Sequence, residues 1–255
     1  AVPGTTPVNA WAPMTSGTTQ NMQAVWGASA TNVFAVGESG TIRRSDGTSW
    51  TAMTSGTTAH LRGMWGTWGT DVFAVGDGGV ILHYDGSAWT AMTSGTNAFL
   101  DGVWGTSGSD VFAAGSSGTI LHWDGTQWTK MAVPTTRSFS AVWGTSRVDV
   151  FTAGEGGALW HYDGVAWSAM VSNAGCHLRS VWGTSGTDVF AVAECGQSVH
   201  YDGTNWSLMT AARAGNAYGL WGAAASDVVA VGDGGMIWRY DGTTWRATPN
   251  GATTA

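Results

Sequence analysis

Charged side chains are scarce in this 255-residue sequence, and lysine is almost missing from it. Charged residues make up 11% of the chain, Lys130 is the single lysine, and the formal net charge is -7. Nucleic acids and anionic membrane surfaces attract basic patches, so this balance argues against both as partners. No run of eighteen apolar residues occurs, which predicts that nothing in the chain spans a bilayer. No stretch shows a helical period either.

Glycine and tryptophan are abundant instead, with 39 and 17 residues, and they recur at a fixed spacing. The Trp of a Val-Trp-Gly-type step returns every 39 residues, at Trp26, Trp65, Trp104, Trp143, Trp182 and Trp221. An Asp-Gly pair keeps the same interval, at Asp46, Asp85, Asp124, Asp163, Asp202 and Asp241. A second Trp follows each pair, at Trp50, Trp89, Trp128, Trp167, Trp206 and Trp245. A period near 40 with several strands per unit is typical of propeller blades.

Each repeat contains four short candidate strands separated by residues that favour tight turns. In the third copy they are residues 99–105, 110–115, 119–124 and 128–132. The second strand is apolar on both alternating faces, which predicts cover from both sides, and the fourth is more polar, which suits an outer edge. The sequence therefore predicts an all-β fold, a six-bladed β-propeller of four-stranded antiparallel blades, as one domain over residues 1–255. The blades start near residues 21, 60, 99, 138, 177 and 216.

The two repeated Trp positions are expected to fill the core between blades. A buried Trp removes ~150 to 250 Å² from water, an upper bound of ~4 to 6 kcal/mol each at ~25 cal/mol per Å². We expect Trp68 to be exposed instead, because it stands in a turn where the other copies carry Ser or Ala. It is therefore a candidate binding aromatic.

The two ends of the chain compete for one position in the ring. Residues 1–10 are an expected irregular lead-in, and the absence of an initial Met suits a processed or trimmed end. Residues 11–19 then repeat the phrase of the fourth strand, so they are an extra outer strand six periods before Trp245. A terminal strand is expected to close the ring. We favour the N-terminal copy, because Pro249 interrupts the C-terminal phrase.

The two cysteines, Cys176 and Cys195, are predicted to face each other across the first hairpin of blade 5. Directly opposed residues in an antiparallel pair have nearly the Cβ separation that a disulfide needs. The sequence thus favours a disulfide over two buried thiols. A disulfide implies an oxidising compartment, so we expect a secreted or periplasmic protein.

The same register places polar residues opposite each other where the first strand begins in each blade. The expected pairs are Asn21 with Glu38, His60 with Asp77, Phe99 with Ser116, Ser138 with Glu155, His177 with Glu194 and Asn216 with Asp233. His60-Leu61-Arg62 and His177-Leu178-Arg179 are the same triplet in two blades that face each other across the ring. A His with a carboxylate partner and a nearby Arg suits acid/base catalysis or anion binding. Alternatively, neighbouring strands satisfy each other's polar ends, and duplication copied one solution.

Three further repeated positions have simpler expected roles. His83, His122, His161 and His200 share one position on the third strand and are expected to be structural, because ligands in different blades do not suit a metal. The Asp of each Asp-Gly pair is expected to bond its own turn. Glu38, Asp77, Glu155, Glu194 and Asp233 form an acidic ring in which a cation could bind if six or more oxygens converged.

The phrase at Asp71 to Trp89 resembles the secreted bacterial propeller repeats that carry a shortened Asp box, and Arg44 to Trp50 is the copy nearest to a full box. This resemblance covers about residues 11–245 and implies a propeller. The repeat is also similar, more loosely, to that of tectonin-type lectins. Asp-box propellers include sialidases, assembly factors, scaffolds and lectins, and the arginine triad of sialidases is not assembled here.

Three functions are compatible with these patterns. The first is a multivalent carbohydrate-binding, lectin-like module, since near-identical blades offer near-identical shallow sites. The second is a secreted protein-interaction scaffold, and the third is an enzyme at the axial mouth. Candidate ligand-binding residues are Glu38, His60, Arg62, Trp68, Asp77, Glu155, His177, Arg179, Glu194 and Asp233. No cofactor is predicted, and the expected partners are glycans or a protein.

Overall fold

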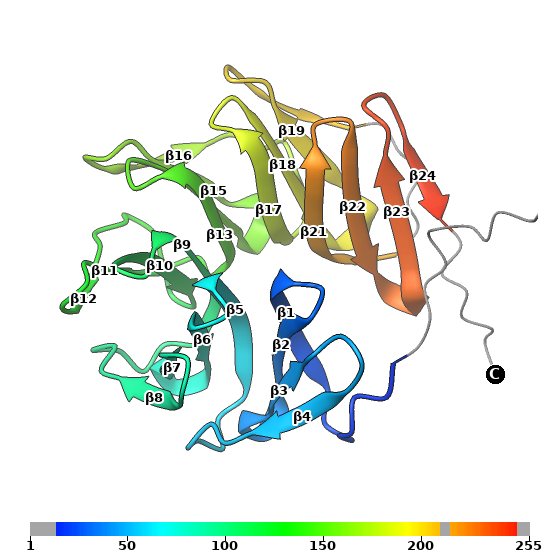
Figure 1. Cartoon of the computed structure of the whole chain (residues 1–255). Helices are drawn as coiled ribbons and strands as arrows, with labels where there is room; N and C mark the ends of the chain where they lie inside the picture. Colours follow the sequence, from blue (N-terminus) through cyan, green and yellow to red (C-terminus); the bar gives the residue numbers. More distant parts are fainter. Residues whose placement is uncertain (1–13, 210–214, 249–255) are drawn as a thin grey trace, which may run out of the picture.

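The structure, a computed structural model, describes residues 14–209 and 215–248. Within these ranges the chain forms six four-stranded sheets, and each sheet is built from four consecutive antiparallel strands. Figure 1 shows the sheets arranged around an axis, with the first strand of each sheet nearest the centre. The predicted six-bladed propeller is confirmed.

The strand bounds repeat closely from blade to blade. The innermost strands are β1 (Met22–Ser29), β5 (Leu61–Trp68), β9 (Leu100–Ser107), β13 (Phe139–Ser146), β17 (Leu178–Ser185) and β21 (Ala217–Ala224). The second strands are β2 (Asn32–Gly37), β6 (Asp71–Gly76), β10 (Asp110–Gly115), β14 (Asp149–Gly154), β18 (Asp188–Ala193) and β22 (Asp227–Gly232). The third strands are β3 (Ile42–Ser45), β7 (Ile81–Tyr84), β11 (Thr119–Trp123), β15 (Leu159–Tyr162), β19 (Ser198–Tyr201) and β23 (Met236–Tyr240). The outer strands are β4 (Trp50–Met53), β8 (Trp89–Met92), β12 (Trp128–Lys130), β16 (Trp167–Met170), β20 (Trp206–Leu208) and β24 (Trp245–Thr248).

Single turns of 3-10 helix join the second and third strands in five blades. They are η1 (Glu38–Gly40), η2 (Asp77–Gly79), η3 (Glu155–Gly157), η4 (Glu194–Gly196) and η5 (Asp233–Gly235). In the described part of the chain, no helix is long and apolar enough to cross a membrane.

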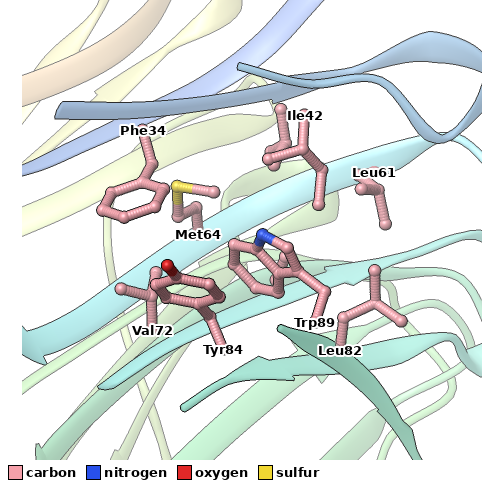
Figure 2. Packing of buried hydrophobic residues seen from close by; sticks show 10 residues of the cluster. Phe34, Ile42, Leu61, Met64, Val72, Leu82, Tyr84 and Trp89 are labelled. Atoms are coloured by element: carbon pink, nitrogen blue, oxygen red, sulfur yellow. The ribbon is translucent and has the colours of Figure 1, made fainter. Parts of the chain in front are cut away.

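The core lies between the blades. The second strand is buried on both faces, as predicted: in blade 2, Val72, Phe73, Ala74 and Val75 are all fully buried. One core cluster joins blade 1 to blade 2, where Phe34 and Ile42 pack against Leu61, Met64 and Trp89 (Figure 2). Equivalent clusters join each later pair up to blades 5 and 6.

A close contact between Trp and Gly fixes the distance between neighbouring blades. The Trp of each Val-Trp-Gly step covers the Gly of that step in the next blade: a Cβ at Gly105 would lie 2.9 Å from the ring of Trp65. Any side chain here would push the blades apart, so the sequence keeps glycine. The same contact recurs from Trp26 on Gly66 to Trp182 on Gly222.

The expectation that all twelve repeated Trp residues fill the core needs one correction. Trp221 is 63% exposed, and Gly27, its counterpart in the first blade, is exposed as well. No core cluster joins blade 6 to blade 1 within the described ranges. Trp221 is exposed because no neighbouring blade covers it.

The closing strand of the last blade also differs from the expected one. β24 pairs with β23 along its whole length, so the C-terminal copy is the fourth strand of blade 6. Pro249 did not prevent this pairing, because β24 ends at Thr248, before the proline. Trp11 lies outside the described residues, and Met14 to Thr19 form no strand.

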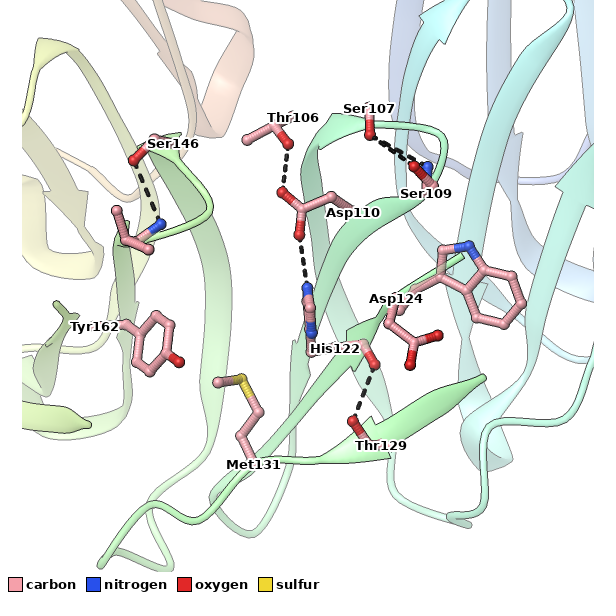
Figure 3. A network of polar contacts seen from close by, with 12 residues as sticks. Thr106, Ser107, Ser109, Asp110, His122, Asp124, Thr129, Met131, Ser146 and Tyr162 are labelled. Atoms are coloured by element: carbon pink, nitrogen blue, oxygen red, sulfur yellow. Dashed lines mark hydrogen bonds and ion pairs between the residues drawn. The ribbon is translucent and has the colours of Figure 1, made fainter. Parts of the chain in front are cut away.

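In each interior blade, the repeated histidine takes part in hydrogen bonds that connect the first three strands near the end of the innermost strand. In blade 3, His122 Nε2 lies 2.6 Å from Asp110 Oδ1, and Thr106 donates to the other carboxylate oxygen (Figure 3). The imidazole also lies on Phe112, with 4.5 Å between ring centroids. The same Thr, Asp and His contacts occur in blades 2, 4 and 5. These histidines are structural, as predicted.

The Asp of each Asp-Gly pair organises its own turn, as expected. In blade 2, Asp85 Oδ1 accepts hydrogen bonds from the backbone of Ser87 and Ala88 and from the Ser87 hydroxyl. These donors stabilise the ionised form, and the Ser87 hydroxyl is the largest contributor, so the pKa of Asp85 falls to about 2.

Candidate functional site

The polar residues singled out from the sequence lie at one end of the ring, where the innermost strands begin. The expected register is correct there: the backbone N–H of Asp77 donates to the carbonyl of His60, and that of Glu194 donates to the carbonyl of His177. The turns between second and third strands therefore surround the starts of the innermost strands. We call the acids of these turns, Glu38, Asp77, Glu155, Glu194 and Asp233, the acidic turns.

A β-bulge interrupts the innermost strand of every blade near its start. In blade 2, Leu61 pairs with Gly76 and Gly63 with Val75, so Arg62 has no partner in the ladder. A bulge turns its extra residue away from the regular alternation of the strand, which is why bulges often lie beside binding sites. The bulged residues are Gln23, Arg62, Asp101, Ser140, Arg179 and Tyr218. We call them the bulge ring.

The bulge ring is one of the most variable positions of the repeat. Its six members are all different except for the two arginines, whereas the Trp and Gly three and four residues later are the same in every copy. Packing requires the constant positions, as the Trp and Gly contact shows. The variable ring is free of that constraint, so its chemistry can serve binding.

Arg62 connects two blades at the bulge ring. Its guanidinium bonds the carboxylate of Asp77 in its own blade and lies 3.4 Å from Asp101 Oδ1 of blade 3. It also lies over the ring of Phe99, 5.4 Å from the centroid. The carboxylate of Asp77 therefore bonds Arg62. This corrects the expectation that it pairs with His60. The bulge is the reason, because it brings Arg62 to the turn.

The same correction applies in blade 5. Arg179 Nε donates to Glu194 Oε1 at 2.9 Å, so the carboxylate opposite His177 also bonds an arginine. His177 Nε2 lies instead 2.7 Å from Ser140 Oγ of blade 4. A serine nucleophile would need a third group to orient the imidazole, and both expected carboxylates are engaged by arginine. The arrangement expected from the sequence, a histidine bonded to the carboxylate opposite it, is therefore not the one found in blade 5.

The remaining acidic turns bond their opposed neighbours. Asn21 Nδ2 donates to Glu38 Oε1 at 3.0 Å, and the backbone N–H of Ser138 donates to Glu155 Oε2 at 3.2 Å. The backbone N–H of Asn216 donates to Asp233 Oδ2 at 3.2 Å, and the hydroxyl of Tyr218, a bulge-ring residue, also donates to this carboxylate, at 2.7 Å from Oδ1. Here the simpler interpretation is correct, since neighbouring strand ends satisfy each other's polar groups.

Electrostatic coupling reaches across the bulge ring. Burial raises the pKa of the Asp101 carboxyl, while Arg62 and, from blade 5, Arg179 oppose that change. Burial and the positive charge of Arg179 lower the pKa of His177, so this imidazole favours its neutral form. Asp101 belongs to blade 3 and Arg179 to blade 5, so charged groups of different blades influence each other at the bulge ring.

The acidic turns do not gather into a metal site. Among the described residues, no three His, Cys, Asp or Glu side chains lie close enough together to hold a metal ion. The carboxylates point to partners in their own blades, and six converging oxygens are not available to a calcium ion.

Trp68 lies away from the bulge ring. It is 73% exposed, as predicted, but it ends β5, whereas Arg62 lies near the start of that strand. The two are therefore at opposite ends of the ring and do not form one site.

The cysteines form the predicted disulfide, with 6.5 Å between the Cα atoms of Cys176 and Cys195. The bridge lies beside the bulge ring, because His177 and Glu194 are its chain neighbours. It therefore joins the two strand ends that carry His177 and the partner of Arg179. An oxidising compartment outside the cytoplasm is indicated by this bond.

Comparisons with known proteins support the fold. No protein-family profile matches the chain, and no curated protein is similar to it in sequence. Among solved structures, Ycf48 bound to D1 peptide is 16% identical with a TM-score of 0.75, covering 94% of this chain and 84% of its own. Ycf48 from Cyanidioschyzon merolae is 14% identical with a TM-score of 0.77, covering 97% and 91%. The WD40 β-propeller domain of Doa1 is 12% identical with a TM-score of 0.74, covering 89% and 82%. At these identities the likeness shows the propeller fold alone.

Proposed function

We propose that this protein is a binding scaffold that holds a polypeptide segment with basic side chains on the bulge ring. One observation carries the proposal: the bulge ring varies from blade to blade beside the acidic turns, whereas the Trp and Gly three and four residues later are the same in every copy. A residue that duplication copies and selection then diversifies is suited to recognise an asymmetric ligand. A peptide is such a ligand, because each of its side chains differs.

The charge at this end of the ring favours a basic segment. The carboxylates are Glu38, Asp77, Asp101, Glu155, Glu194 and Asp233, and the guanidinium groups near them are Arg62, Arg137 and Arg179. The carboxylates are in excess, and the whole chain is negatively charged. An acidic rim attracts cationic segments over about a Debye length, ~10 Å at 0.1 M salt.

Two exposed aromatic side chains add apolar contact area at the same end. Phe99 is 50% exposed and Tyr218 is 48% exposed, and they belong to blades 3 and 6, which face each other across the ring. Aromatic faces bind the ammonium or guanidinium group of a basic side chain as well as its aliphatic stem. One of the structural neighbours is Ycf48 bound to D1 peptide, which supports a peptide as the class of ligand.

Peptide binding measured by fluorescence anisotropy tests this proposal. Three peptide panels of equal length are compared, one rich in Lys and Arg, one neutral and one rich in Asp and Glu. We expect preference for the basic panel, with affinity falling as salt rises. The double variant Asp101→Asn and Glu155→Gln should weaken binding by about tenfold, and Trp68→Ala should leave it unchanged, because Trp68 lies at the other end. Equal binding of all three panels would contradict the proposal.

Location outside the cytoplasm is part of the same proposal. The disulfide supports a secreted or periplasmic protein, where a structural disulfide persists. Protein isolated without reductant should resist thiol alkylation until it is reduced. Alkylation of both cysteines in the native protein would contradict this location.

Glycan binding is the second candidate, and three equivalent hollows favour it. Two of them lie at loops that lead from an outer strand to the next blade, and the third lies at residues 14–19, where the sequence of this loop recurs before blade 1. The volumes are about 630 and 490 Å³ for the first two and about 670 Å³ for the third. Thr54 to Thr58 line one of them, with hydroxyls of the kind that bond sugars. However, Ser55 is buried and its hydroxyl donates to the carbonyl of Thr57, so part of the repeated loop is explained by its own turn. A glycan array followed by titration calorimetry decides this candidate. Several sites per chain would support it, and no binding across the array would exclude it.

A further inference from the structure

The turn between the second and third strands of blade 5 differs from the same turn in the other blades. The residue before this turn is a glycine in the other five blades: Gly37, Gly76, Gly115, Gly154 and Gly232. A Cβ at Gly76 would lie 2.1 Å from the carbonyl oxygen of His60, and the other four glycines are similarly close to the equivalent oxygen. Blade 5 has the buried Ala193 here, with a φ of -121° against -170° at Gly76. Its backbone therefore follows another path.

A hydrogen bond that closes this turn elsewhere is missing in blade 5. In blade 2 the backbone N–H of Val80 donates to the carbonyl of Asp77, and the same bond is present in blades 1, 3, 4 and 6. The corresponding bond of blade 5, between the described residues Gln197 and Glu194, is absent. The flanking bond from Ala193 to Gln197 is kept. The disulfide lies at this turn, so it restrains a turn that its own backbone does not close.

Cys195 also has a backbone conformation that side chains disfavour. Its φ is +64°, and glycine occupies the same position in blades 2, 4 and 6. Ser39 and Ser117 adopt this conformation in blades 1 and 3, but their turns keep the closing bond. Among the described turns, only that of blade 5 combines an unfavourable conformation with a missing bond. Cys195 is exposed, so a reductant can reach the bridge.

The turn of blade 5 contacts two members of the bulge ring. Glu194, next to Cys195, accepts a hydrogen bond from Arg179 at 2.9 Å. The backbone N–H of Cys195 donates to Asn216 Oδ1 of blade 6 at 2.9 Å, and Asn216 Nδ2 lies 3.4 Å from the hydroxyl of Tyr218. A change in this turn therefore reaches an arginine of blade 5 and an exposed aromatic residue of blade 6.

We propose that the disulfide is a redox-sensitive clamp that holds Arg179 and Tyr218 in their places in the bulge ring. A dithiol opens it by thiol–disulfide exchange: one thiolate of the reagent attacks a sulfur of the bridge, and its second thiol resolves the mixed disulfide. The reagent gives up two electrons and becomes a cyclic disulfide, and Cys176 and Cys195 take up its two protons as thiols. The turn then relaxes and releases both contacts.

The consequence for ligands rests on the proposed function. Arg179 and Tyr218 belong to the surface that is proposed to hold a basic peptide, so loss of their positions should weaken peptide binding. The clamp itself is a property of the turn and is measured without a ligand.

Hydrogen–deuterium exchange of the oxidised and the dithiol-reduced full chain tests the clamp. The chain has two cysteines, so reduction acts at one bond. The reporters are the backbone amides of Glu194 and Cys195, which donate to His177 and Asn216. We expect reduction to speed their exchange by about tenfold or more, because the turn opens locally. The equivalent amide of Asp77 in blade 2 is the control and should keep its rate.

A matched pair of variants separates the clamp from a general loss of stability. Cys176→Ala with Cys195→Ser removes the bridge without a reductant and should reproduce the fast exchange. Adding Ala193→Gly restores the residue of the other blades, so the closing bond can form and exchange should slow again without a cross-link.

Equal exchange in the oxidised and reduced protein would overturn the clamp. Faster exchange in every blade, with no rescue by Ala193→Gly, would overturn it as well, because the bridge would then stabilise the whole fold. Anisotropy with the basic peptide panel follows on the same samples, and we expect binding about fivefold weaker after reduction. Unchanged affinity beside a loosened turn would contradict the control of binding by the clamp. Absence of binding to the oxidised protein would contradict the proposed function, and the exchange rates would still decide the clamp.

Discussion

Blades 2 to 5 and the two terminal blades have almost the same repeat but differ in how much of it is buried. Each interior blade is covered on both faces by a neighbour, whereas blades 1 and 6 each have one face that no core cluster of described residues covers. We call these two faces, with Trp221 and Val231 on blade 6 and Val25 on blade 1, the seam. The same Val-Trp-Gly step is packed in blade 3 and open at Val25 and Trp221. Burial of these residues is therefore set by the neighbouring blade and not by the residues themselves.

The polar network of the blades changes at the same boundary. Blades 2 to 5 keep Thr, Asp and His, but blade 1 has Arg44 bonded to Asn32 at 2.9 Å. Blade 6 has Arg239, which bonds both carboxylate oxygens of Asp227. Arg239 lies on the face of blade 6 that no described blade covers, where a guanidinium tolerates solvent, so this change fits the loss of a neighbour. Arg44 instead lies over Phe34, which is fully buried, so a missing neighbour does not explain the change in blade 1.

Deleting β24 should have the largest effect on this difference. Removing residues 245–255 takes away the ladder on β23 and the buried Trp245, which packs on Phe190 in the cluster between blades 5 and 6. Loss of a buried Trp alone costs ~3 to 5 kcal/mol, so we expect the melting temperature to fall by about 10 °C or more. Deleting residues 1–13 should lower it less. A greater fall on the N-terminal deletion would show that the first copy closes the last blade.

Removing the disulfide should have the next largest effect. Blade 3 carries Ala98 and Ser117 at these two positions, so Cys176→Ala with Cys195→Ser gives blade 5 the residues of its unbridged counterpart. The bridge closes a loop with a sequence separation of 19, and the chain-entropy account gives it ~3 kcal/mol. Denaturant unfolding should show a loss of about this size. An unchanged midpoint would mean that blade 5 is held by packing alone.

A pair of Trp substitutions compares an interior face with the seam directly. Trp104 covers Gly144 of the next blade and is half-buried, so Trp104→Ala should cost ~2 to 3 kcal/mol. Trp221 is 63% exposed, so Trp221→Ala should cost ~1 kcal/mol or less. Equal losses in denaturant unfolding would mean that the seam is as well packed in solution as the interior faces.

The elements and the disulfide could be predicted because they depend on local chemistry. Alternation sets the strands, and Gly, Ser and Asp set the turns, so in blade 3 β10 has the predicted bounds and β9 begins one residue later than expected. The register then follows from the turn, and it brought Cys176 opposite Cys195. Trp68 was expected to be exposed because it stands in a turn where the other blades carry Ser or Ala, and it is exposed.

The carboxylate partners could not be predicted from the register alone, because the bulge adds one residue to the strand. A regular ladder turns Arg62 and Arg179 toward a different face, and the bulge turns them toward Asp77 and Glu194. Asp101 and Ser140 were not predicted as site residues, because they also lie at bulges and neither belongs to a repeated polar pair. A signal was present, because this position differs from copy to copy while the Trp and Gly three and four residues later stay constant. The closing strand and the exposure of Trp221 depend on contacts between distant blades, about which one repeat carries no information.

The Asp-Gly turns should lose the same amount of stability in acid in terminal and interior blades. This is the smallest of the expected effects, and it tests whether the terminal blades differ from the interior ones only at the seam. The pKa is lowered to about 2 for both Asp46 in blade 1 and Asp124 in blade 3, in each case by hydrogen bonds from the two following residues, led by Ser49 at Asp46 and by Thr126 at Asp124. A carboxyl with a depressed pKa stabilises the fold fully above its unfolded pKa, ~3.9, and loses this contribution as the pH falls through its folded pKa. Asp46→Asn and Asp124→Asn should each flatten the fall in stability between about pH 4 and pH 2 by the same small amount, because no neighbouring blade contacts these exposed carboxylates. Denaturant unfolding at a series of pH values measures both. If Asp46→Asn had a much smaller effect than Asp124→Asn, blade 1 would be loosened throughout, and its exposure could no longer be attributed to the seam alone.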